Sequence, residues 1–406
     1  MKIRALTGFM DPGWPLDTSK IEQMASCLST VQEALERADF EVQTLRLATP
    51  PPSELDHPIP VGERADFARA LEAEIFVHGL DYAAIGPALP DDPQGYEAAV
   101  QIISATEQIF TSGIYADPST GISLPAARAC AQAIVDISTL ESNGFGNLRF
   151  AALVNVPAGT PFFPAAYHRT GPPTLAVACE AADLAVLALQ GSSSPAKTRS
   201  QLVSAIENQA ITIEHIVERE ARSFDIRFHG IDFSLAPFPQ TDLSLGTALE
   251  GLGVPALGLG GSVAAAAFFA SSLDQANFKR TGFCGLFLPV LEDSVLAQRA
   301  ADGSLTIKDL LLYSTLCGTG LDTIPLPGDT STEALTALLL DLGALGLRHT
   351  KPLTARLMPI PGKQAGDDVH FDFPYFADSK VMALQAQPLH GQLTGSGTLD
   401  IDPPKP

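Results

Sequence analysis

Basic residues and cysteines are scarce in this sequence. Across 406 residues, 25 lysines and arginines stand against 46 aspartates and glutamates, so the formal net charge is −21. Nucleic acids and anionic membrane surfaces are bound by clusters of basic residues, and neither is therefore expected as the main partner. The five cysteines are widely spaced and never form a CxxC pair, which argues against a disulfide framework and a zinc site.

Long apolar runs are also missing. No window of about twenty apolar residues predicts a membrane-spanning helix. The apolar stretch near the N-terminus is interrupted by Asp11 and Pro12, so no signal peptide is predicted either. With 46% hydrophobic and only 17% charged residues, the chain can bury a large core. We expect a globular protein located in the cytoplasm.

The sequence does contain a repeated alternation of short β-type runs and amphipathic helical runs, which is typical of α/β folds. It predicts ten strands in two sets of five, at residues 2–8, 40–46, 82–86, 110–115 and 149–154, then 228–235, 254–259, 283–287, 320–325 and 352–358. Helices are predicted at residues 17–38, 64–77, 94–109, 125–140, 174–190, 197–222, 244–251, 262–275, 292–301, 305–316 and 331–345. Composition and length favour one large α/β barrel with the helices outside.

We expect a single domain over residues 1–406. Its first half covers about residues 1–190, its second half about 195–385, and a C-terminal tail follows at 386–406. A Gly-Ser-Ser-Ser-Pro sequence at 191–195 separates the two sets of strands. A surface loop that caps the next helix is the favoured interpretation of this sequence, and a domain linker is the alternative.

The first segment that suggests function is 155–173, which follows a predicted strand and holds five prolines in nineteen residues. Prolines stiffen a long connection and lower the entropy lost when it holds a ligand. Tyr167, His168 and Arg169 offer a hydroxyl, a group that exchanges protons near neutral pH, and a bidentate anion ligand. The alternative is that Arg169 pairs with one of the many carboxylates.

A second segment begins at Asp232. Because side chains alternate along a strand, Asp232 and Ser234 share one face, opposite Ile231 and Phe233. With helices outside a barrel, this polar face points into the barrel mouth. If the faces are reversed, the two residues cap a neighbouring helix instead.

The third segment is a glycine turn that leads into a helix at Gly260, Gly261 and Ser262. Free backbone N–H groups at the start of a helix can bind an anion. The spacing does not match a nucleotide-binding GxGxxG motif. Tight packing between a strand and a helix explains the glycines equally well.

The fourth segment runs from Cys317 to Asp329. Cys317 is predicted between a helix and a strand, where a thiolate could react, although a buried and inert cysteine is the more common case. Asp322 and Asp329 are candidates for metal binding or proton transfer. After the last predicted strand, Lys363 stands in a Pro-Gly turn, where it either binds an anion or is simply solvated.

These segments together resemble the DUF711 family, also called UPF0210. The resemblance rests on residues 147–173, 232–239, 317–329 and 358–367. It implies a ten-stranded β/α barrel built from two five-stranded halves, like that of the pyruvate formate-lyase and ribonucleotide reductase group. It also implies a link to a small ACT-domain protein, which members of the family often have encoded beside them.

Enzymes of that barrel group use a C-terminal glycyl radical and a cysteine on a finger loop. The C-terminal glycines of this chain, Gly391, Gly395 and Gly397, do not match the glycyl-radical signature, so no glycyl radical is expected. Cys317 could still correspond to the finger-loop cysteine.

The sequence therefore predicts an enzyme that binds a small anionic metabolite in the barrel mouth. Arg169, Lys363 and the amides of 260–262 would hold the anion, with Tyr167 and Ser234 beside them. Acid–base chemistry, with or without a divalent metal, is assigned to His168, Asp232 and Asp322.

Two alternatives come from other classes of protein. The first is a non-catalytic metabolite sensor or scaffold, and the second is cysteine-based chemistry at Cys317. A homodimer is expected, and nothing in the sequence locates its interface.

Overall fold

The computed structural model describes residues 1–316 and 319–404. The strands are β1 (Lys2–Phe9), β2 (Leu45–Ala48), β3 (Tyr82–Ala84), β4 (Ile109–Asp117), β5 (Gly121–Ser123), β6 (Phe150–Val154), β7 (Thr174–Glu180), β8 (Arg227–Asp232), β9 (Gly320–Pro327), β10 (Leu353–Ile360), β11 (Asp368–Val369), β12 (Ser379–Lys380) and β13 (Thr398–Leu399). The α-helices are α1 (Thr18–Glu36), α2 (Arg64–Val77), α3 (Gly95–Ala105), α4 (Leu124–Ser138), α5 (Ala182–Leu189), α6 (Pro195–Arg222), α7 (Leu245–Gly251), α8 (Ser262–Gln275), α9 (Ser294–Asp302), α10 (Ile307–Ser314) and α11 (Thr332–Arg348).

One large, mostly parallel sheet organises the fold, in the order β8-β7-β1-β2-β3-β4-β6-β10-β9. The strands β1, β2, β3, β4 and β6 pair in parallel, as do β7 with β8 and β9 with β10. The two sets meet in antiparallel ladders, β1 with β7 and β6 with β10. Strand direction therefore reverses in the connection between β6 and β7, at residues 155–173, and not at the Ser-rich loop 191–195.

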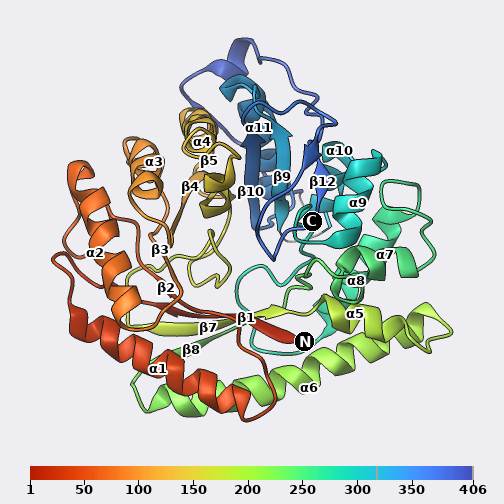
Figure 1. The fold of residues 1–406 in the computed structure, drawn as a ribbon, viewed down its shortest axis with the longest axis horizontal. Coiled ribbons are helices and arrows are strands. Elements are labelled where there is room, and N and C mark those ends of the chain that lie inside the picture. Colours follow the sequence, from red (N-terminus) through yellow and green to blue (C-terminus); the bar gives the residue numbers. More distant parts are fainter. Residues whose placement is uncertain (317–318, 405–406) are drawn as a thin grey trace.

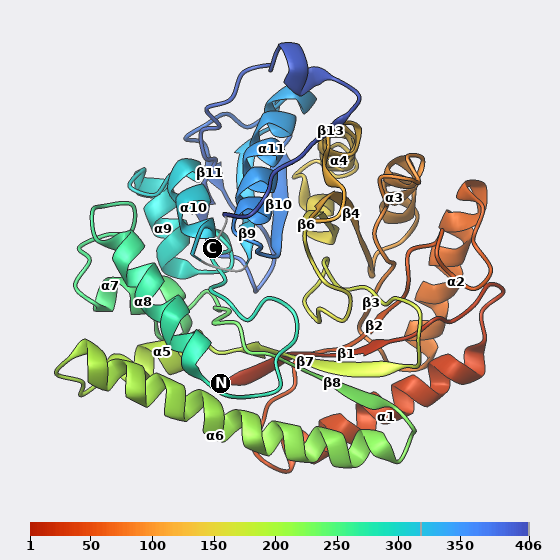
Figure 2. The same ribbon diagram turned by 180° about the vertical axis from the view of Figure 1, so that it is seen from behind.

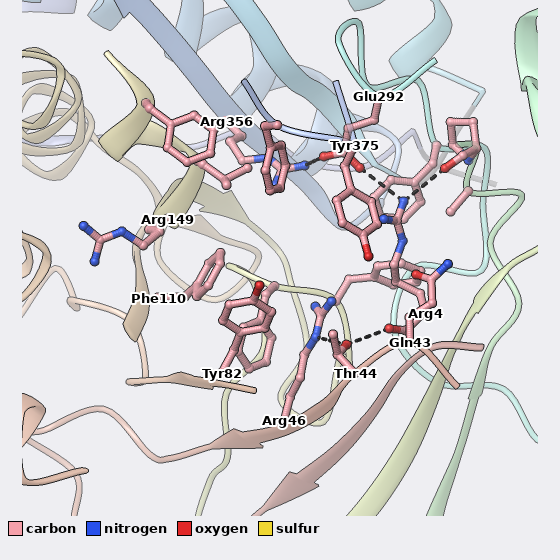
Figure 3. Close-up of a pocket in the computed structure, with 18 of the residues that line it drawn as sticks. Arg4, Gln43, Thr44, Arg46, Tyr82, Phe110, Arg149, Glu292, Arg356 and Tyr375 are labelled. Atoms are coloured by element: carbon pink, nitrogen blue, oxygen red, sulfur yellow. Dashed lines mark hydrogen bonds and ion pairs between the residues drawn. The ribbon is translucent and has the colours of Figure 1, made fainter. Parts of the chain in front are cut away.

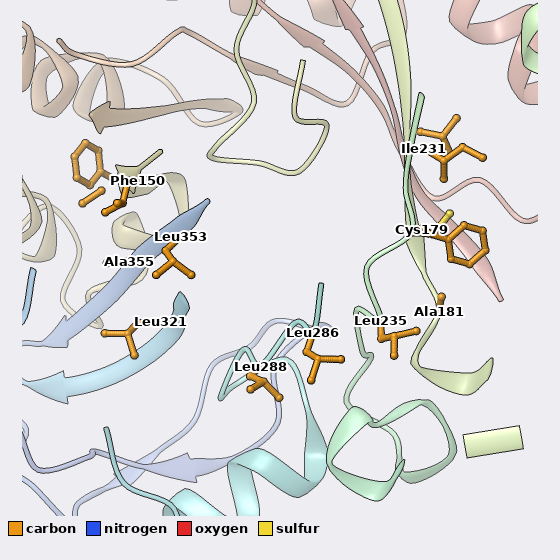
Figure 4. Close-up of a cluster of buried hydrophobic side chains, with 14 of the residues drawn as sticks. Phe150, Cys179, Ala181, Ile231, Leu235, Leu286, Leu288, Leu321, Leu353 and Ala355 are labelled. Atoms are coloured by element: carbon orange, nitrogen blue, oxygen red, sulfur yellow. The ribbon is translucent and has the colours of Figure 1, made fainter. Parts of the chain in front are cut away.

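Between β8 and β9, the chain around residues 280–289 makes isolated bridges to both sides. Arg280 bridges Ile231, Leu286 bridges Leu235, and Pro289 bridges Asp322, all with parallel geometry. Figure 4 shows Leu235, Leu286, Leu288 and Leu321 lying one after another across this region. The helices lie outside the strands, around a central region that loop segments cross (Figure 1, Figure 2).

Side-chain size alternates along the strands. Outward residues such as Leu175 and Val177 of β7 pack against the helices in the main core. Inward positions are often alanine, and these alanines belong to the same apolar clusters as the segment that follows β6: Ala5, Ala48, Ala84, Ala151, Ala176 and Ala178. Small inward side chains leave room for this inserted segment, whose Phe162 and Tyr167 fill the inner core.

The structure corrects three predicted elements. Residues 283–287, predicted as a strand, form only isolated bridges such as that of Leu286. Residues 174–180 form strand β7 and not the start of a helix, because a strand covered on both faces reads as a continuous apolar run. Residues 254–259, predicted as a strand, form an irregular connection before α8. There Gly258 has φ +95°, and a Cβ at this position would collide with the carbonyl of Ser304.

The loop at 191–195 is exposed. The Ser194 side chain accepts a hydrogen bond from the Lys197 amide at the start of α6, which agrees with the capping interpretation. Within the described residues, no helix combines the length and the apolar character needed to cross a bilayer.

Candidate functional site

A cavity of about 440 Å³ opens on the inner side of the sheet (Figure 3). Its wall comes from β1, β2, β3, β4 and β10 together with the loops that cross the centre. Eight of the twenty lining residues are aromatic: Tyr82, Phe110, Phe145, Phe162, Phe163, Phe287, Phe373 and Tyr375. Four are arginines: Arg4, Arg46, Arg149 and Arg356. The chain has only 25 lysines and arginines, so four arginines are a high concentration for one cavity. Three glutamates also line it: Glu107, Glu141 and Glu292.

The inserted segment 155–173 builds one side of the cavity. Phe162 and Phe163 belong to it, and Phe163 contacts Phe110 edge to face at a ring-centroid distance of 5.3 Å. The Thr7 hydroxyl of β1 donates to the carbonyl of Pro161 at 2.9 Å, which ties the segment to the sheet. The proline-rich connection predicted to carry function therefore does line the site, through its phenylalanines.

Two of the arginines belong to a buried ion network. Arg356 binds Asp322 with two nitrogens, at 2.5 and 3.0 Å, and reaches Glu292 at 2.5 Å. Arg4 contacts the other oxygen of Glu292 at 3.3 Å and Glu180 at 3.4 Å. Burial raises the pKa of Asp322, while the charge of Arg356 opposes that rise. Glu292 thus joins the two arginines, as Figure 3 shows.

Irregular strand pairing directs these side chains inward. The register of β1 against β7 shifts between Ile3 and Ala5, which leaves Arg4 without a partner in that ladder. Similarly, Arg356 stands between the paired positions Ala355 and Leu357 at a shift in the β9–β10 register. Such bulges re-aim side chains and are common beside functional sites.

Arg46 differs from these two arginines because no carboxylate pairs with it within residues 1–316 and 319–404. Its Nε donates to the Thr44 hydroxyl at 2.8 Å, and the described residues supply no acceptor for its two terminal nitrogens. The guanidinium carbon lies 5.0 Å from the centroid of the Phe163 ring and 5.7 Å from that of Tyr82. Burial lowers the pKa of Arg46 to about 10, and the nearby positive charge of Arg4 adds to this. Arg46 therefore remains a cation at neutral pH.

Two phenol groups face the same space. Figure 3 shows the hydroxyls of Tyr82 and Tyr375 directed toward the space beside Arg46. Neither hydroxyl has a hydrogen-bond partner in the part of the chain that the structure describes. Burial raises the pKa of Tyr82, so its phenol keeps its proton at neutral pH and can donate it in a hydrogen bond.

Arg149 has a structural role at the edge of the cavity. Its guanidinium donates to the carbonyls of Ile103, Thr106 and Ile109, at 2.9, 2.7 and 3.3 Å. These bonds satisfy carbonyls at and just beyond the C-terminal end of α3, as basic side chains often do. In Figure 3 its guanidinium points away from the other labelled arginines.

Asp232 and Ser234, predicted to face the barrel mouth, hold the chain together instead. The Asp232 carboxylate accepts from the amides of Phe283 and Cys284 at 2.7 and 2.9 Å and from the Ser234 hydroxyl at 2.6 Å. The Ser234 oxygen in turn accepts from the Gly285 amide at 3.1 Å. Burial raises the pKa of Asp232 to about 6 against these donors. Both side chains fasten β8 to the strand-like chain at 280–289.

The three consecutive residues 167–169, predicted to act together, lie in different environments in the structure. Tyr167 is buried, donates to the Val156 carbonyl at 2.9 Å, and has a pKa raised by burial to about 12. His168 is also buried, and its Nε2 has no hydrogen-bond partner among the described residues. Arg169 is exposed, and its ion pair among the described residues is with Glu54, at 3.9 Å. None of the three lines the cavity.

The other predicted residues also lie outside the cavity lining. Gly260 and Gly261 are exposed before α8, and the Ser262 hydroxyl donates to the Leu259 carbonyl at 2.8 Å. Lys363 is exposed in the turn after β10, and Cys317 lies outside the described residues. Asp322 alone joins the site, as the partner of Arg356.

A divalent cation does not fit Asp232 or Asp322. Asp329, the other predicted metal ligand, is exposed in the turn after β9. Both oxygens of Asp322 are taken by Arg356, and those of Asp232 by backbone amides and a hydroxyl. In residues 1–316 and 319–404, no group of three His, Cys, Asp or Glu side chains is arranged to hold a metal.

Comparison with known sequences agrees with the resemblance. A family model described as "Uncharacterised ACR (DUF711)" matches residues 1–378. The chain belongs to this family. A UPF0210 protein of Pyrobaculum islandicum is 31% identical over 352 residues, which covers 83% of this chain and 78% of the relative. Another, from Oleidesulfovibrio alaskensis, is 27% identical over 372 residues, or 87% of this chain and 82% of the relative.

Sequence reasoning missed the arginines that define the site. Arg4, Arg46 and Arg356 each interrupt an apolar strand, in the sequences KIRAL, TLRLA and TARLM. A cation inside such a strand is costly unless something binds it. An arginine inside an apolar strand, in a chain poor in basic residues, is therefore the sequence signal that could have identified these three residues.

Proposed function

We propose that the protein is an enzyme that binds a small anionic metabolite in the cavity, with Arg46 as its anchor. One observation carries the proposal: the terminal nitrogens of Arg46 face the cavity without a partner in the described residues. A half-buried guanidinium without a counter-ion costs stability, and a bound anion relieves that cost. The volume of about 440 Å³ suits a small metabolite.

Acid–base chemistry is assigned to the phenols. Tyr82 is held protonated by burial and lies beside the proposed anion anchor, so it can donate a hydrogen bond or a proton to a substrate oxygen. Tyr375 stands across the same space. This assignment replaces His168 and Asp232 as the proton-transfer groups, because neither lines the cavity.

We also infer that the sheet closes into a ten-stranded barrel like that of the pyruvate formate-lyase group. The isolated bridges on both sides of residues 280–289 support this, as do the two sets of parallel strands that meet in antiparallel ladders. In such a barrel, residues 155–173 join the two halves and occupy the place of the finger loop. That segment contains no cysteine, so chemistry at a finger-loop thiol is not proposed.

A binding screen tests the anchor. Purified protein is titrated with a library of small carboxylates and phosphates while thermal stability is followed, and hits are repeated with Arg46→Met. We expect a hit that raises Tm in the native protein and not in the variant. Arg169→Met is the matched control, since this exposed arginine lies outside the cavity. If every hit acts equally on native protein and Arg46→Met, the proposed anchor is wrong.

A non-catalytic sensor or scaffold, acting with an ACT-domain partner, is the second candidate. It is favoured by the ion network, in which Glu180, Glu292 and Asp322 are all engaged in ion pairs with arginines. Incubation of a bound metabolite followed by mass spectrometry separates the two functions. A new product that disappears in Tyr82→Phe supports the enzyme, and binding without product supports the sensor.

A further inference from the structure

We infer that the ligand of this cavity is an aromatic monocarboxylate. The inference rests on the proposed function, because it names the chemical class of the anion that Arg46 holds. Three properties of the described residues support it: the direction of the free guanidinium nitrogens, the number of unpaired charges, and the composition of the wall.

The guanidinium of Arg46 offers its end to a ligand. Its Nε is used by Thr44, which leaves Nη1 and Nη2 as two parallel donors. Phe163 and Tyr82 lie against the guanidinium and limit its rotation, since stacked arginines keep their in-plane N–H groups free. Two parallel N–H groups match the two oxygens of a carboxylate.

The charges favour a single negative charge on the ligand. Arg4 and Arg356 are already paired with three carboxylates, Glu180, Glu292 and Asp322. Arg149 is bound to backbone carbonyls. Among the described residues that line the cavity, Arg46 is left as the cation without a carboxylate or carbonyl partner. Three glutamates, Glu107, Glu141 and Glu292, line the same cavity and repel any second negative charge, so a dianion such as a phosphate monoester is held less well than a carboxylate.

The wall favours an aromatic body. Aromatic residues make up eight of the twenty lining residues, against 7% of the whole chain. They already pair edge to face, as Tyr82 does with Phe110 at 5.4 Å, while Phe162 lies tilted against Phe287 at 4.5 Å. A flat ring placed among such rings gains edge-to-face and offset contacts that a saturated ring of the same size does not.

Four probes of similar size separate these properties: phenylacetate, its neutral analogue phenylacetamide, its saturated analogue cyclohexylacetate, and phenyl phosphate. Each is titrated by calorimetry at pH 7.5 into the native protein, Arg46→Met and Phe163→Leu. Arg169→Met serves as the control. The unfolding temperature of each ligand-free protein is measured first, so that a folding defect is not read as lost binding.

We expect phenylacetate to bind best. Arg46→Met weakens it by about tenfold or more, because a charge-assisted fork is lost, and Arg169→Met has no effect. Phe163→Leu reduces the preference for phenylacetate over cyclohexylacetate. Phenylacetamide binds the native protein about as weakly as phenylacetate binds Arg46→Met.

Other outcomes overturn the inference in distinguishable ways. If phenyl phosphate binds more tightly than phenylacetate and depends on Arg46, the ligand class is wrong and the proposed anion anchor stands. If cyclohexylacetate matches phenylacetate, the aromatic part is wrong. If neither phenylacetate nor phenyl phosphate shows binding that depends on Arg46, the inference fails; failure of the anion screen as well would remove the proposed function.

Discussion

At the scale of single residues, the same side chain has different roles according to its neighbours. Within the described residues, Arg4 and Arg356 are held by carboxylates and Arg149 by carbonyls, whereas Arg46 contacts only a hydroxyl and two rings. A buried ion pair contributes little net stability, yet removing one partner is costly because the other charge is left unpaired. An unpaired cation, in contrast, costs stability while it is present.

This contrast predicts opposite effects for two similar substitutions. Arg356→Met leaves Asp322 and Glu292 without their main partner and should lower the free energy of unfolding by about 3–5 kcal/mol. Arg46→Met removes an unpaired charge and should leave the stability of ligand-free protein unchanged or higher. Urea unfolding of both variants measures the difference. Equal losses in both variants would show that Arg46 is paired in solution.

The buried imidazole of His168 predicts a pH dependence. Burial lowers its pKa below the usual 6.5, and burial also lowers the pKa of His229. Between the folded-state pKa and about 6.5, the unfolded chain binds a proton that the folded protein does not. Stability is therefore complete above pH 6.5 and falls as the pH drops through that window.

His168→Gln should remove part of that pH dependence. We expect the loss of Tm between pH 7.5 and pH 5.5 to be smaller in the variant than in the native protein, as measured by calorimetry. The exposed His57 provides the control, and His57→Gln should leave the loss unchanged. An unaltered pH dependence in His168→Gln would mean that this histidine is not buried neutral.

At the scale of elements, the inward-facing positions of the strands are often occupied by alanine. Ala176 and Ala178 of β7 face the inserted segment, while Leu175 and Val177 face the helices. Alanine favours helices, and a strand that is apolar on both faces has no polar alternation. For both reasons the sequence predicts a helix where β7 forms. By contrast, the predicted limits of 64–77 and 262–275 agree with α2 and α8.

Enlarging an inward alanine should disturb the cavity from a distance. Ala178→Leu places extra methyl groups against the inserted segment and should cost about 1–3 kcal/mol through overpacking. Because Phe162 and Phe163 belong to that segment, ligand affinity should fall too. Chemical unfolding and the anion titration measure the two effects. Ala264→Leu, on the exposed side of α8, should change neither.

At the scale of the whole molecule, the two parallel sets of strands are joined on both sides. The β1–β7 and β6–β10 ladders connect them at the sheet, and the pair between Arg4 and Glu292 connects them inside the cavity. With so many contacts across the junction, neither half is expected to be stable alone.

The two halves should therefore unfold in a single transition. Trp14, the only tryptophan, lies in the first half, so its fluorescence reports on that half while far-UV circular dichroism reports on the whole chain. We expect the two signals to have coincident midpoints in urea. A circular dichroism signal with a second transition that Trp14 does not follow would indicate independent halves.

The sequence by itself determined the α/β class, most helix limits and the expectation of an anion site. These depend on local information: hydrophobic periodicity, capping residues such as Ser194, and a count of charges. Only the tertiary structure decided which cations form the site. Arg4, Arg46 and Arg356 are far apart in the chain and meet because neighbouring strands and bulges bring them to one cavity. Whether a buried arginine is paired or free depends on such distant neighbours, and no local pattern contains that information.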